Sequence, residues 1–253
     1  IITVRQFPAH PIEMNQLIAW GAVTSEAVDF LEKLVKAGYN IFVSGGTGSG
    51  KTTFLNALSN YIPKEERIIT IEDNAELQIR GVANLVRLEA RKGNTQGDHE
   101  ITIRDLIKAS LRMRPDRVIV GEVRGEETID MIQAMNNGHD GSLSTGHGNS
   151  PRDMLARLET MILMGMDLPV SAVRRQIASG LDIMVHLGRM RDRSRKVLEI
   201  LEITGYSYEK EEILTHTLYE FEEHKKGGDK VYGTLVKKGE LQQIRKLERA
   251  GLM

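Results

Sequence analysis

A glycine-rich run near the N-terminal end of the chain has the residue types and spacing that bind nucleoside phosphates. Residues 45–52 read GGTGSGKT and match the pattern G-x-x-x-x-G-K-[ST]. Glycines let successive backbone N–H groups point at phosphate oxygens, and a helix that begins here adds its positive N-terminal end. We expect Lys51 to reach the β- and γ-phosphates and Thr52 to place its hydroxyl on Mg²⁺. The predicted phosphate-binding residues are Gly46, Thr47, Gly48, Ser49, Gly50, Lys51, Thr52 and Thr53.

Carboxylates follow two strand-like runs and could handle metal and water. Glu72 and Asp73 follow one run of β-branched residues, and Glu122 follows another after a single glycine. Ligands of a doubly wound sheet bind beyond the carboxyl ends of its strands, so both sets should face the phosphates. We predict that Glu122 orients or deprotonates the attacking water. Glu72 and Asp73 would hold Mg²⁺ or share the base role. The alternative is that all three are surface acids at strand ends.

A histidine ends a further strand-like run. His147 closes the segment Ser144-Thr145-Gly146-His147, where its ring could bond the γ-phosphate or the acidic residues. We predict a catalytic or sensing role for it, with a structural histidine as the alternative. His139 has a weaker claim to the same role.

Arginines are dense around these acids. An arginine supplied across a subunit boundary can stabilise the charge that develops during phosphoryl transfer. Such an arrangement would require a ring in which each site is completed by a neighbour. Solvated helix faces and local ion pairs are the alternative for every one of them. The candidates are Arg87, Arg91, Arg112 and Arg124.

The elements that position these residues alternate between strand and helix, which favours a mostly parallel sheet with helical crossovers. Apolar runs predict strands at 40–44, 67–71, 85–88, 118–120, 142–145 and 183–187. Apolar residues at helical spacing predict helices at 24–38, 51–60, 102–113, 126–137, 151–163 and 170–179. Beyond residue 189 the pattern changes to a hairpin of long strands, 197–204 and 213–221, and a small helix at 240–247. The predicted fold class is α/β, a P-loop NTPase domain with a C-terminal β-hairpin and helical extension.

The length of the chain and the positions of two prolines suggest how it is divided into domains. With 253 residues it has room for one large domain or two small ones. Residues 1–20 contain two prolines and are interpreted as a linker or as the last strand of a missing N-terminal domain. Residues 21–190 would form the nucleotide-binding domain, and residues 191–253 an extension packed on it.

The composition excludes several classes of function. Lys and Arg total 34 against 35 Asp and Glu, for a net charge of -1, which argues against a generally basic nucleic-acid-binding surface. The absence of cysteine excludes disulfides, cysteine-ligated zinc and thiol catalysis. Aromatic residues are only 5% of the chain, so base-stacking platforms are not expected. We find no signal peptide and no apolar stretch long enough to span a bilayer.

Four blocks of sequence together resemble a known family. They are GGTGSGKTT at 45–53, RIITIEDNAELQI at 67–79, LRMRPDRVIVGEVRGEE at 111–127 and NGHDGSLSTGHGNS at 137–150. In this order they resemble the Walker A, Asp-box, Walker B and His-box blocks of the type II/type IV secretion ATPase superfamily. The last two blocks, with LPVSAVRRQIASGLDIMV at 168–185, are most similar to the Tad/Flp pilus assembly branch.

The resemblance implies a RecA-like ATPase domain that uses ATP and Mg²⁺ in a homo-hexameric ring. Such a ring would work a platform protein of the inner membrane from its cytoplasmic face, and so move pilin or secreted subunits. Glu122 aligns with the Walker B glutamate, Glu72 and Asp73 with the Asp box, and His139 and His147 with the His box. Residues 1–20 would be the final strand and hinge of the N-terminal domain. Neither zinc nor nucleic acid is expected as a partner.

Other classes of P-loop protein account for less of the sequence. A RecA- or helicase-type nucleic-acid motor is the main alternative, and the balanced charge disfavours it. A small-molecule kinase or GTPase would leave the acid and histidine blocks unexplained. A nucleotide-binding regulator that does not hydrolyse is disfavoured by the intact Lys51, Thr52 and Glu122.

Overall fold

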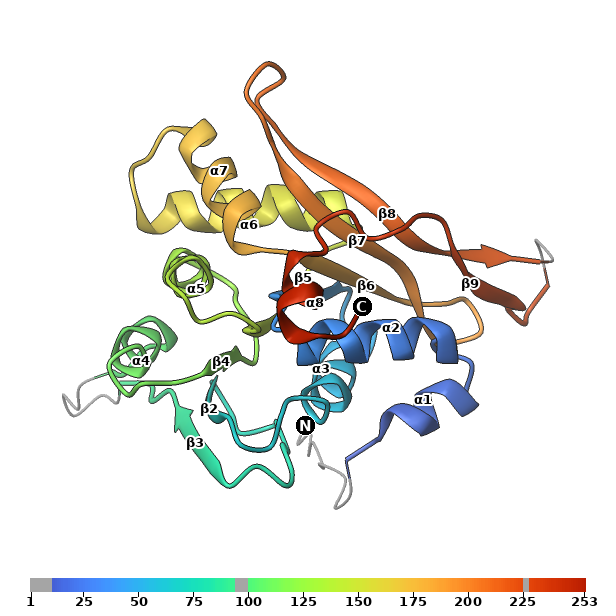
Figure 1. The fold of residues 1–253 in the computed structure, drawn as a ribbon, viewed down its shortest axis with the longest axis horizontal. Helices are drawn as coiled ribbons and strands as arrows, with labels where there is room; N and C mark the ends of the chain where they lie inside the picture. Colours follow the sequence, from blue (N-terminus) through green and yellow to red (C-terminus); the bar gives the residue numbers. More distant parts are fainter. Residues whose placement is uncertain (1–10, 94–99, 225–227) are drawn as a thin grey trace, which may run out of the picture.

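The fold is built on one continuous mixed sheet with helices on both faces (Figure 1). The computed structural model describes residues 11–93, 100–224 and 228–253. The sheet has nine strands in the order β3-β2-β4-β5-β1-β6-β7-β8-β9. The predicted α/β class, with a mostly parallel sheet flanked by helices, is confirmed.

Six strands form the parallel part of the sheet. They are short and rich in β-branched residues, and β1 and β4 are buried along their whole length, as expected of strands covered on both faces. Because neighbouring strands run parallel, their carboxyl ends meet at one edge of the sheet. The strands are β1 (Ile41–Gly45), β2 (Arg67–Glu72), β3 (Asn84–Glu89), β4 (Arg117–Val120), β5 (Leu143–His147) and β6 (Ile183–Arg189).

Two apolar clusters hold the helices against the two faces of the sheet. Alternation along β1 assigns Ile41 and Val43 to one cluster and Phe42 to the other. The first cluster includes residues of α1 (Met14–Ala19), α2 (Ser25–Lys36), α3 (Lys51–Ser59) and α8 (Arg245–Ala250). The second includes residues of α4 (Ile103–Ser110), α5 (Glu127–Asn136), α6 (Pro151–Gly165) and α7 (Val170–Gly180).

Side-chain caps fix where several helices begin. The Thr24 hydroxyl accepts a hydrogen bond from the Ala27 N–H at the start of α2. The Ser150 hydroxyl does the same for the Asp153 N–H at the start of α6, where Pro151 occupies the first helical position. The second cap sets the direction in which the chain leaves the end of β5, which carries His147.

The C-terminal strands continue the same sheet. β7 (Arg195–Ser207) pairs antiparallel with β6, and β8 (Glu212–Glu223) and β9 (Gly233–Lys237) follow in turn. The long hairpin of the sequence analysis is therefore an extension of the nucleotide-binding sheet by backbone hydrogen bonds. Strand β9 was not expected, because its five residues begin with glycine, end in lysine and show little alternation. The final helix lies at 245–250, a few residues beyond the predicted 240–247.

The segment before α2 contains a helix that the sequence analysis did not predict. Residues 1–10 of the proposed linker or strand lie outside the described residues, and the next residues form α1. A capping box between Glu13 and Gln16 begins this helix, and the buried Met14 and Leu17 attach it to the first cluster. Helix α1 therefore lies near α3, which follows the phosphate-binding loop.

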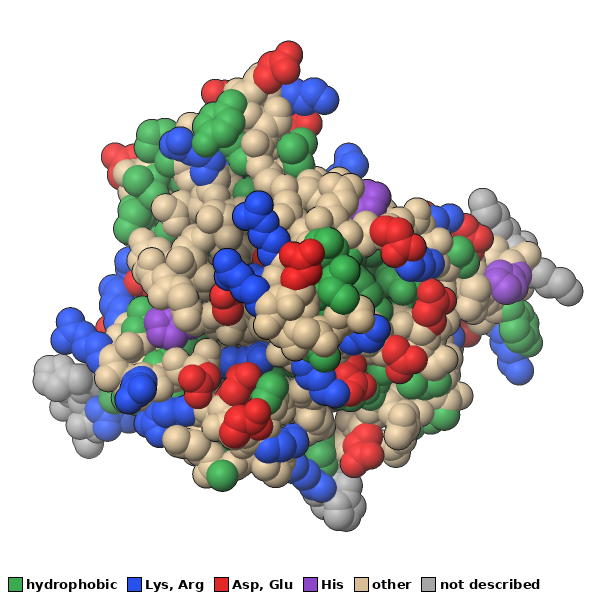
Figure 2. All heavy atoms as spheres, viewed as in Figure 1, with side chains coloured by type: hydrophobic (Ala, Val, Ile, Leu, Met, Phe, Trp, Pro, Cys, Tyr) green, Lys and Arg blue, Asp and Glu red, His purple; other side chains and the backbone are tan. Residues whose placement is uncertain are grey.

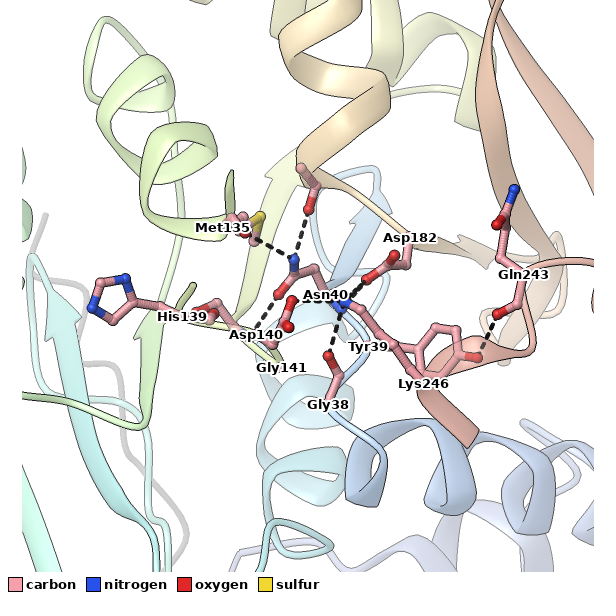
Figure 3. Close-up of polar contacts among 12 residues, drawn as sticks. Gly38, Tyr39, Asn40, Met135, His139, Asp140, Gly141, Asp182, Gln243 and Lys246 are labelled. Atoms are coloured by element: carbon pink, nitrogen blue, oxygen red, sulfur yellow. Dashed lines mark hydrogen bonds and ion pairs between the residues drawn. The ribbon is translucent and has the colours of Figure 1, made fainter. Parts of the chain in front are cut away.

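A polar network fixes the C-terminal helix at the edge of the sheet opposite the phosphate-binding loop (Figure 3). The Lys246 ammonium contacts Asp182 Oδ2 at 2.7 Å and Asp140 Oδ1 at 2.8 Å, and donates to the Gly38 carbonyl. Asp182 in turn accepts the Asn40 N–H at 2.7 Å. Burial raises the pKa of Asp182, and the neighbouring Lys246 lowers it. Helix α8 is thus held by one lysine where β1 and β6 begin.

Acidic and basic side chains are interspersed over the face seen in Figure 2, as the near-zero net charge requires. Among the described residues, no helix combines the length and the apolar character needed to cross a membrane.

Candidate functional site

The glycine-rich run forms the turn between β1 and α3, at the carboxyl edge of the parallel strands. Gly50 is the residue before α3 and has φ +95°, a left-handed conformation that glycine adopts without steric cost. This conformation turns the chain so that the first helical residues are Lys51 and Thr52. The loop and helix N-terminus therefore have the geometry of an anion-binding site.

Three predicted catalytic residues meet above the loop. Glu122 follows β4 after one residue, His147 ends β5, and Lys51 begins α3. His147 Nε2 lies 2.7 Å from Glu122 Oε1, and His147 Nδ1 lies 3.3 Å from the Lys51 ammonium nitrogen. Lys51 also donates to the Gly46 carbonyl at 3.2 Å. The structure thus brings together a cation, a histidine and a carboxylate from three different elements.

These contacts fix the proton on the histidine ring. An ammonium group can only donate, so the contact with Lys51 makes His147 Nδ1 the acceptor and leaves the ring proton on Nε2, which lies 2.7 Å from Glu122 Oε1 without forming a hydrogen bond to it. Burial lowers the pKa of His147, Glu122 raises it, and Lys51, Arg124 and Arg157 lower it again. Burial also lowers the pKa of Lys51, against an opposing effect of Glu122. His147 is therefore neutral at pH 7.

Arg124 pairs within its own chain with Glu122, the carboxylate predicted to act on water. Its guanidinium donates to Glu122 Oε2 from Nε at 2.9 Å and from Nη2 at 2.5 Å. A second carboxylate, that of Asp73, lies 3.7 Å away. The hydrogen bond to Glu122 is the main cause of the raised pKa of Arg124. Arg124 holds one oxygen of the Glu122 carboxylate by two hydrogen bonds, and the other oxygen, Oε1, lies beside His147 Nε2 but accepts no hydrogen bond among the described residues.

Glu72 is a buried part of the site. Its Oε1 accepts the N–H groups of Glu76 at 3.0 Å and Leu77 at 2.9 Å, which fixes the turn after β2. A Cβ on Gly121 would lie 2.9 Å from the Glu72 Cγ, so glycine leaves the space that this side chain occupies. Burial raises the pKa of Glu72, and the two backbone hydrogen bonds lower it.

The donors around Thr52 suit a hard cation held together with a nucleotide. Thr52 and the exposed Asp73 both line the cleft and offer a hydroxyl and a carboxylate. Mg²⁺ in nucleotide sites commonly takes one or two protein oxygens and completes its shell with phosphates and water. The described residues contain no cluster of three or more His, Asp or Glu that would bind a metal ion without a nucleotide. Glu72, whose Oε1 is engaged by backbone, is the less available ligand.

A cleft of about 780 Å³ opens over the loop and extends to the N-terminal segment. Its walls include residues that the sequence analysis did not assign to the site. Arg195, at the start of β7, donates from Nε to the Gly48 carbonyl at 2.9 Å. The apolar Ile12, Leu17 and Trp20 also line the cleft, and Trp20 is 59% exposed. The basic run MRDRSRK at 190–196 was the available signal for Arg195.

Other predicted residues lie away from this group. His139 precedes β5 at the opposite edge, where its Nδ1 lies 3.3 Å from the Ala134 carbonyl oxygen (Figure 3). Arg87 is exposed on the edge strand β3, and Arg91 and Arg112 are exposed beyond β3 and α4. None of these four residues lines the cleft. The structure brings Arg124 into the site but not the other candidate arginines.

Comparison with known proteins identifies relatives of this chain. The model of the family "Type II/IV secretion system protein" matches residues 1–248. A Mycobacterium tuberculosis protein that carries a conjugal-transfer name is 40% identical over 188 residues, 74% of this chain and 53% of its own length. The type IV secretion system protein PtlH of Bordetella pertussis is 40% identical over 177 residues, 68% of this chain and 52% of its own length. The chain thus spans about half the length of these curated relatives.

Solved structures share the fold. The VirB11 ATPase of the Brucella suis type IV secretion system, solved with sulphate, has a TM-score of 0.63 and 32% identity over 78% of this chain and 60% of its own. The pilus retraction motor PilT with bound ADP has a TM-score of 0.56 and 22% identity, covers 98% of this chain and 58% of its own, and supports the fold alone. The four sequence blocks, the mixed sheet and the family match agree, and the chain belongs to the type II/IV secretion system protein family.

Proposed function

We propose that this chain is the ATP-hydrolysing part of a motor that drives secretion or pilus assembly. The observation that carries the proposal is the contact of Lys51, His147 and Glu122 above the phosphate-binding loop. A site that only bound nucleotide would not need a carboxylate that Arg124 holds by two hydrogen bonds beside His147 and Lys51. The 32% identical VirB11 is an ATPase of a type IV secretion system and was solved with sulphate, an anion of phosphate-like geometry.

The geometry gives each side chain a step in hydrolysis. Lys51 exchanges its contact with the Gly46 carbonyl for oxygens of the β- and γ-phosphates. Glu122 orients a water molecule in line with the γ-phosphorus and accepts its proton as the new P–O bond forms. The bond between the γ-phosphorus and the bridging oxygen breaks, and its electrons leave with ADP. Arg124 and His147 keep the Glu122 carboxylate in place throughout.

The metal ion and the nucleobase of ATP would occupy separate parts of the cleft. Thr52 and Asp73 would hold Mg²⁺, which supplies charge neutralisation on the phosphates when it binds with ATP. The apolar wall of Ile12, Leu17 and Trp20 would pack against the base, since an exposed tryptophan beside a phosphate site offers an aromatic face. Arg195 lies beside Gly48, where it can add charge to the phosphate-binding loop.

We further propose the Tad/Flp type of pilus assembly as the process, on the wording of the blocks at 111–127 and 137–150. The working form would be a homo-hexameric ring at the cytoplasmic face of the inner membrane, bound there through a platform protein. The balanced net charge supports protein rather than nucleic acid as the substrate of the motor.

The proposal is tested by ATP turnover and ATP binding in two variants. We expect Lys51→Ala to lose both binding and turnover, because its cation is required to hold the phosphates. Glu122→Gln should bind ATP with affinity near that of the wild type but hydrolyse it at least a hundredfold more slowly, because an amide cannot accept the proton. Turnover of GTP is measured in parallel as the alternative substrate. Unchanged turnover in Glu122→Gln would exclude Glu122 as the base and move that role to Glu72.

A further inference from the structure

A second pocket adjoins the nucleotide cleft at His147. It has a volume of about 410 Å³ and is separate from the larger cleft. The two share only Thr47, Arg124 and His147 in their walls. The floor of the second pocket is apolar, with Val123 and Met161, and its rim is formed by the loop that follows β5. The γ-phosphate position beside His147 is therefore the point at which the two spaces meet.

The charged groups of this pocket are all cationic or neutral. Arg124, Arg157 and His147 line it, and no aspartate or glutamate does. Arg124 is already paired with Glu122 and Asp73. Arg157, which is exposed on α6, has no ion-pair partner among the described residues. Its charge is felt at the site, since it is one of the groups that lower the pKa of His147.

The nearby carboxylate of Asp153 forms no ion pair with Arg157 among the described residues. Asp153 lies in the first turn of α6, and its Oδ2 accepts the Asn149 N–H at 2.8 Å. Asp153 is absent from the pocket lining. A small dianion that enters the space would therefore meet Arg157 and the backbone of Gly148 and Asn149 rather than a competing acid.

We propose that this pocket is a transit site for inorganic phosphate, with Arg157 as the cation that receives it. The inference rests on the proposed ATP hydrolysis, which makes phosphate beside His147 while ADP still fills the larger cleft. A pocket of this size accepts hydrated phosphate, and ADP leaves from the larger cleft. Phosphate and ADP then depart by different routes, with His147 between them.

The first test is equilibrium binding of radiolabelled inorganic phosphate to the ADP-loaded protein at constant ionic strength, adjusted with chloride. We expect Arg157→Gln to weaken phosphate binding about tenfold, because it removes a charge-assisted contact. Arg152→Gln is the matched control: Arg152 is exposed on the same helix but lies outside the pocket lining, so phosphate binding should not change. Equal phosphate affinity in the two variants would overturn the proposal. This measurement needs no hydrolysis.

The second test separates phosphate release from ATP cleavage. Acid quench reports cleaved ATP whether or not the phosphate has left, and a fluorescent phosphate sensor reports only released phosphate. In Arg157→Gln the ratio of the release rate to the cleavage rate should fall severalfold relative to Arg152→Gln. An unchanged ratio would contradict the proposal. A wild-type protein that cleaves no ATP would instead refute the proposed function, and the binding measurement would still decide whether the pocket binds phosphate.

Discussion

At the scale of single residues, the placement of the candidate site residues was predictable from a motif or from a position at the end of a strand. Lys51, Glu122 and His147 were assigned from motif and strand-end position, and the structure places them in contact. The pairing of Arg124 with Glu122 was not predictable, because it depends on the rotamer of a long side chain two residues away. Arg195 was missed because its contact with Gly48 joins segments far apart in the sequence.

The tautomer of His147 leads to a pH prediction. Its pKa is lowered from 6.5, mainly by burial, so the ring is neutral at pH 7 and becomes charged only at lower pH. Protonation puts a second cation 3.3 Å from the Lys51 ammonium and removes the acceptor at Nδ1. We therefore expect kcat/KM for ATP to fall as the pH decreases through the pKa of His147, which lies below its ordinary value.

Two histidine variants check this assignment. A glutamine at position 147 can still accept a hydrogen bond from Lys51 and donate one to Glu122, but it does not titrate. His147→Gln should therefore hydrolyse ATP more slowly, and its kcat/KM should not show the fall at low pH. His224→Gln replaces an exposed histidine beyond β8 and should keep this fall unchanged. If kcat/KM of His147→Gln still fell at the same pH, the titration would belong to another group.

At the scale of elements, β1, β2 and β4 were predicted well because they are short, mostly buried runs that contain several β-branched residues. The antiparallel strand β9 was not, because only its pairing with β8 makes its residues a strand. Helix α1 was missed for a similar reason: six residues form a marginal helix in isolation, and burial of Met14 and Leu17 stabilises it. Tertiary packing decides the structure of such short segments.

The contact that holds α8 gives a stability prediction. Lys246→Met removes the cation and leaves the partly buried Asp182 with only the Asn40 N–H. We expect a loss of about 1–3 kcal/mol in the free energy of unfolding, measured by denaturant titration at pH 7. Burial raises the pKa of Asp182, so the loss should shrink as the pH falls and Asp182 protonates, because a neutral carboxyl needs no cation.

The control for this prediction is a lysine in an exposed pair. Lys237 contacts Glu240 at 2.7 Å, and the Glu240 side chain is 85% exposed. Lys237→Met should therefore change the stability by less than about 0.5 kcal/mol. An equal loss in both variants would show that the network around Asp182 contributes no more than a surface ion pair. ATP turnover should survive in Lys246→Met, since the network lies at the edge opposite the loop.

At the scale of the whole molecule, the family match covers nearly the entire chain, yet the chain spans only about half of its curated relatives. The four sequence blocks were enough to predict the family. Assembly was not predictable in the same way, because exposed arginines look alike whether they face solvent or a neighbour. The structure narrows the set of arginines that could complete a neighbour's site. Arg124 pairs with Glu122 within its own chain, whereas Arg87, Arg91 and Arg112 do not line the cleft.

Mixing inactive variants tests whether neighbours complete each site. Lys51→Ala has no working phosphate site but retains Arg112, and Arg112→Gln retains the phosphate site but lacks the arginine. If Arg112 acts on the adjacent subunit, each variant alone should be nearly inactive, and a mixture should recover turnover that rises with total protein concentration. Arg87 and Arg91 are tested in the same way. Full activity in all three arginine variants, with a specific activity independent of concentration, would refute completion by neighbours. It would mean that Lys51, Glu122, His147 and Arg124 form a site that works within one chain.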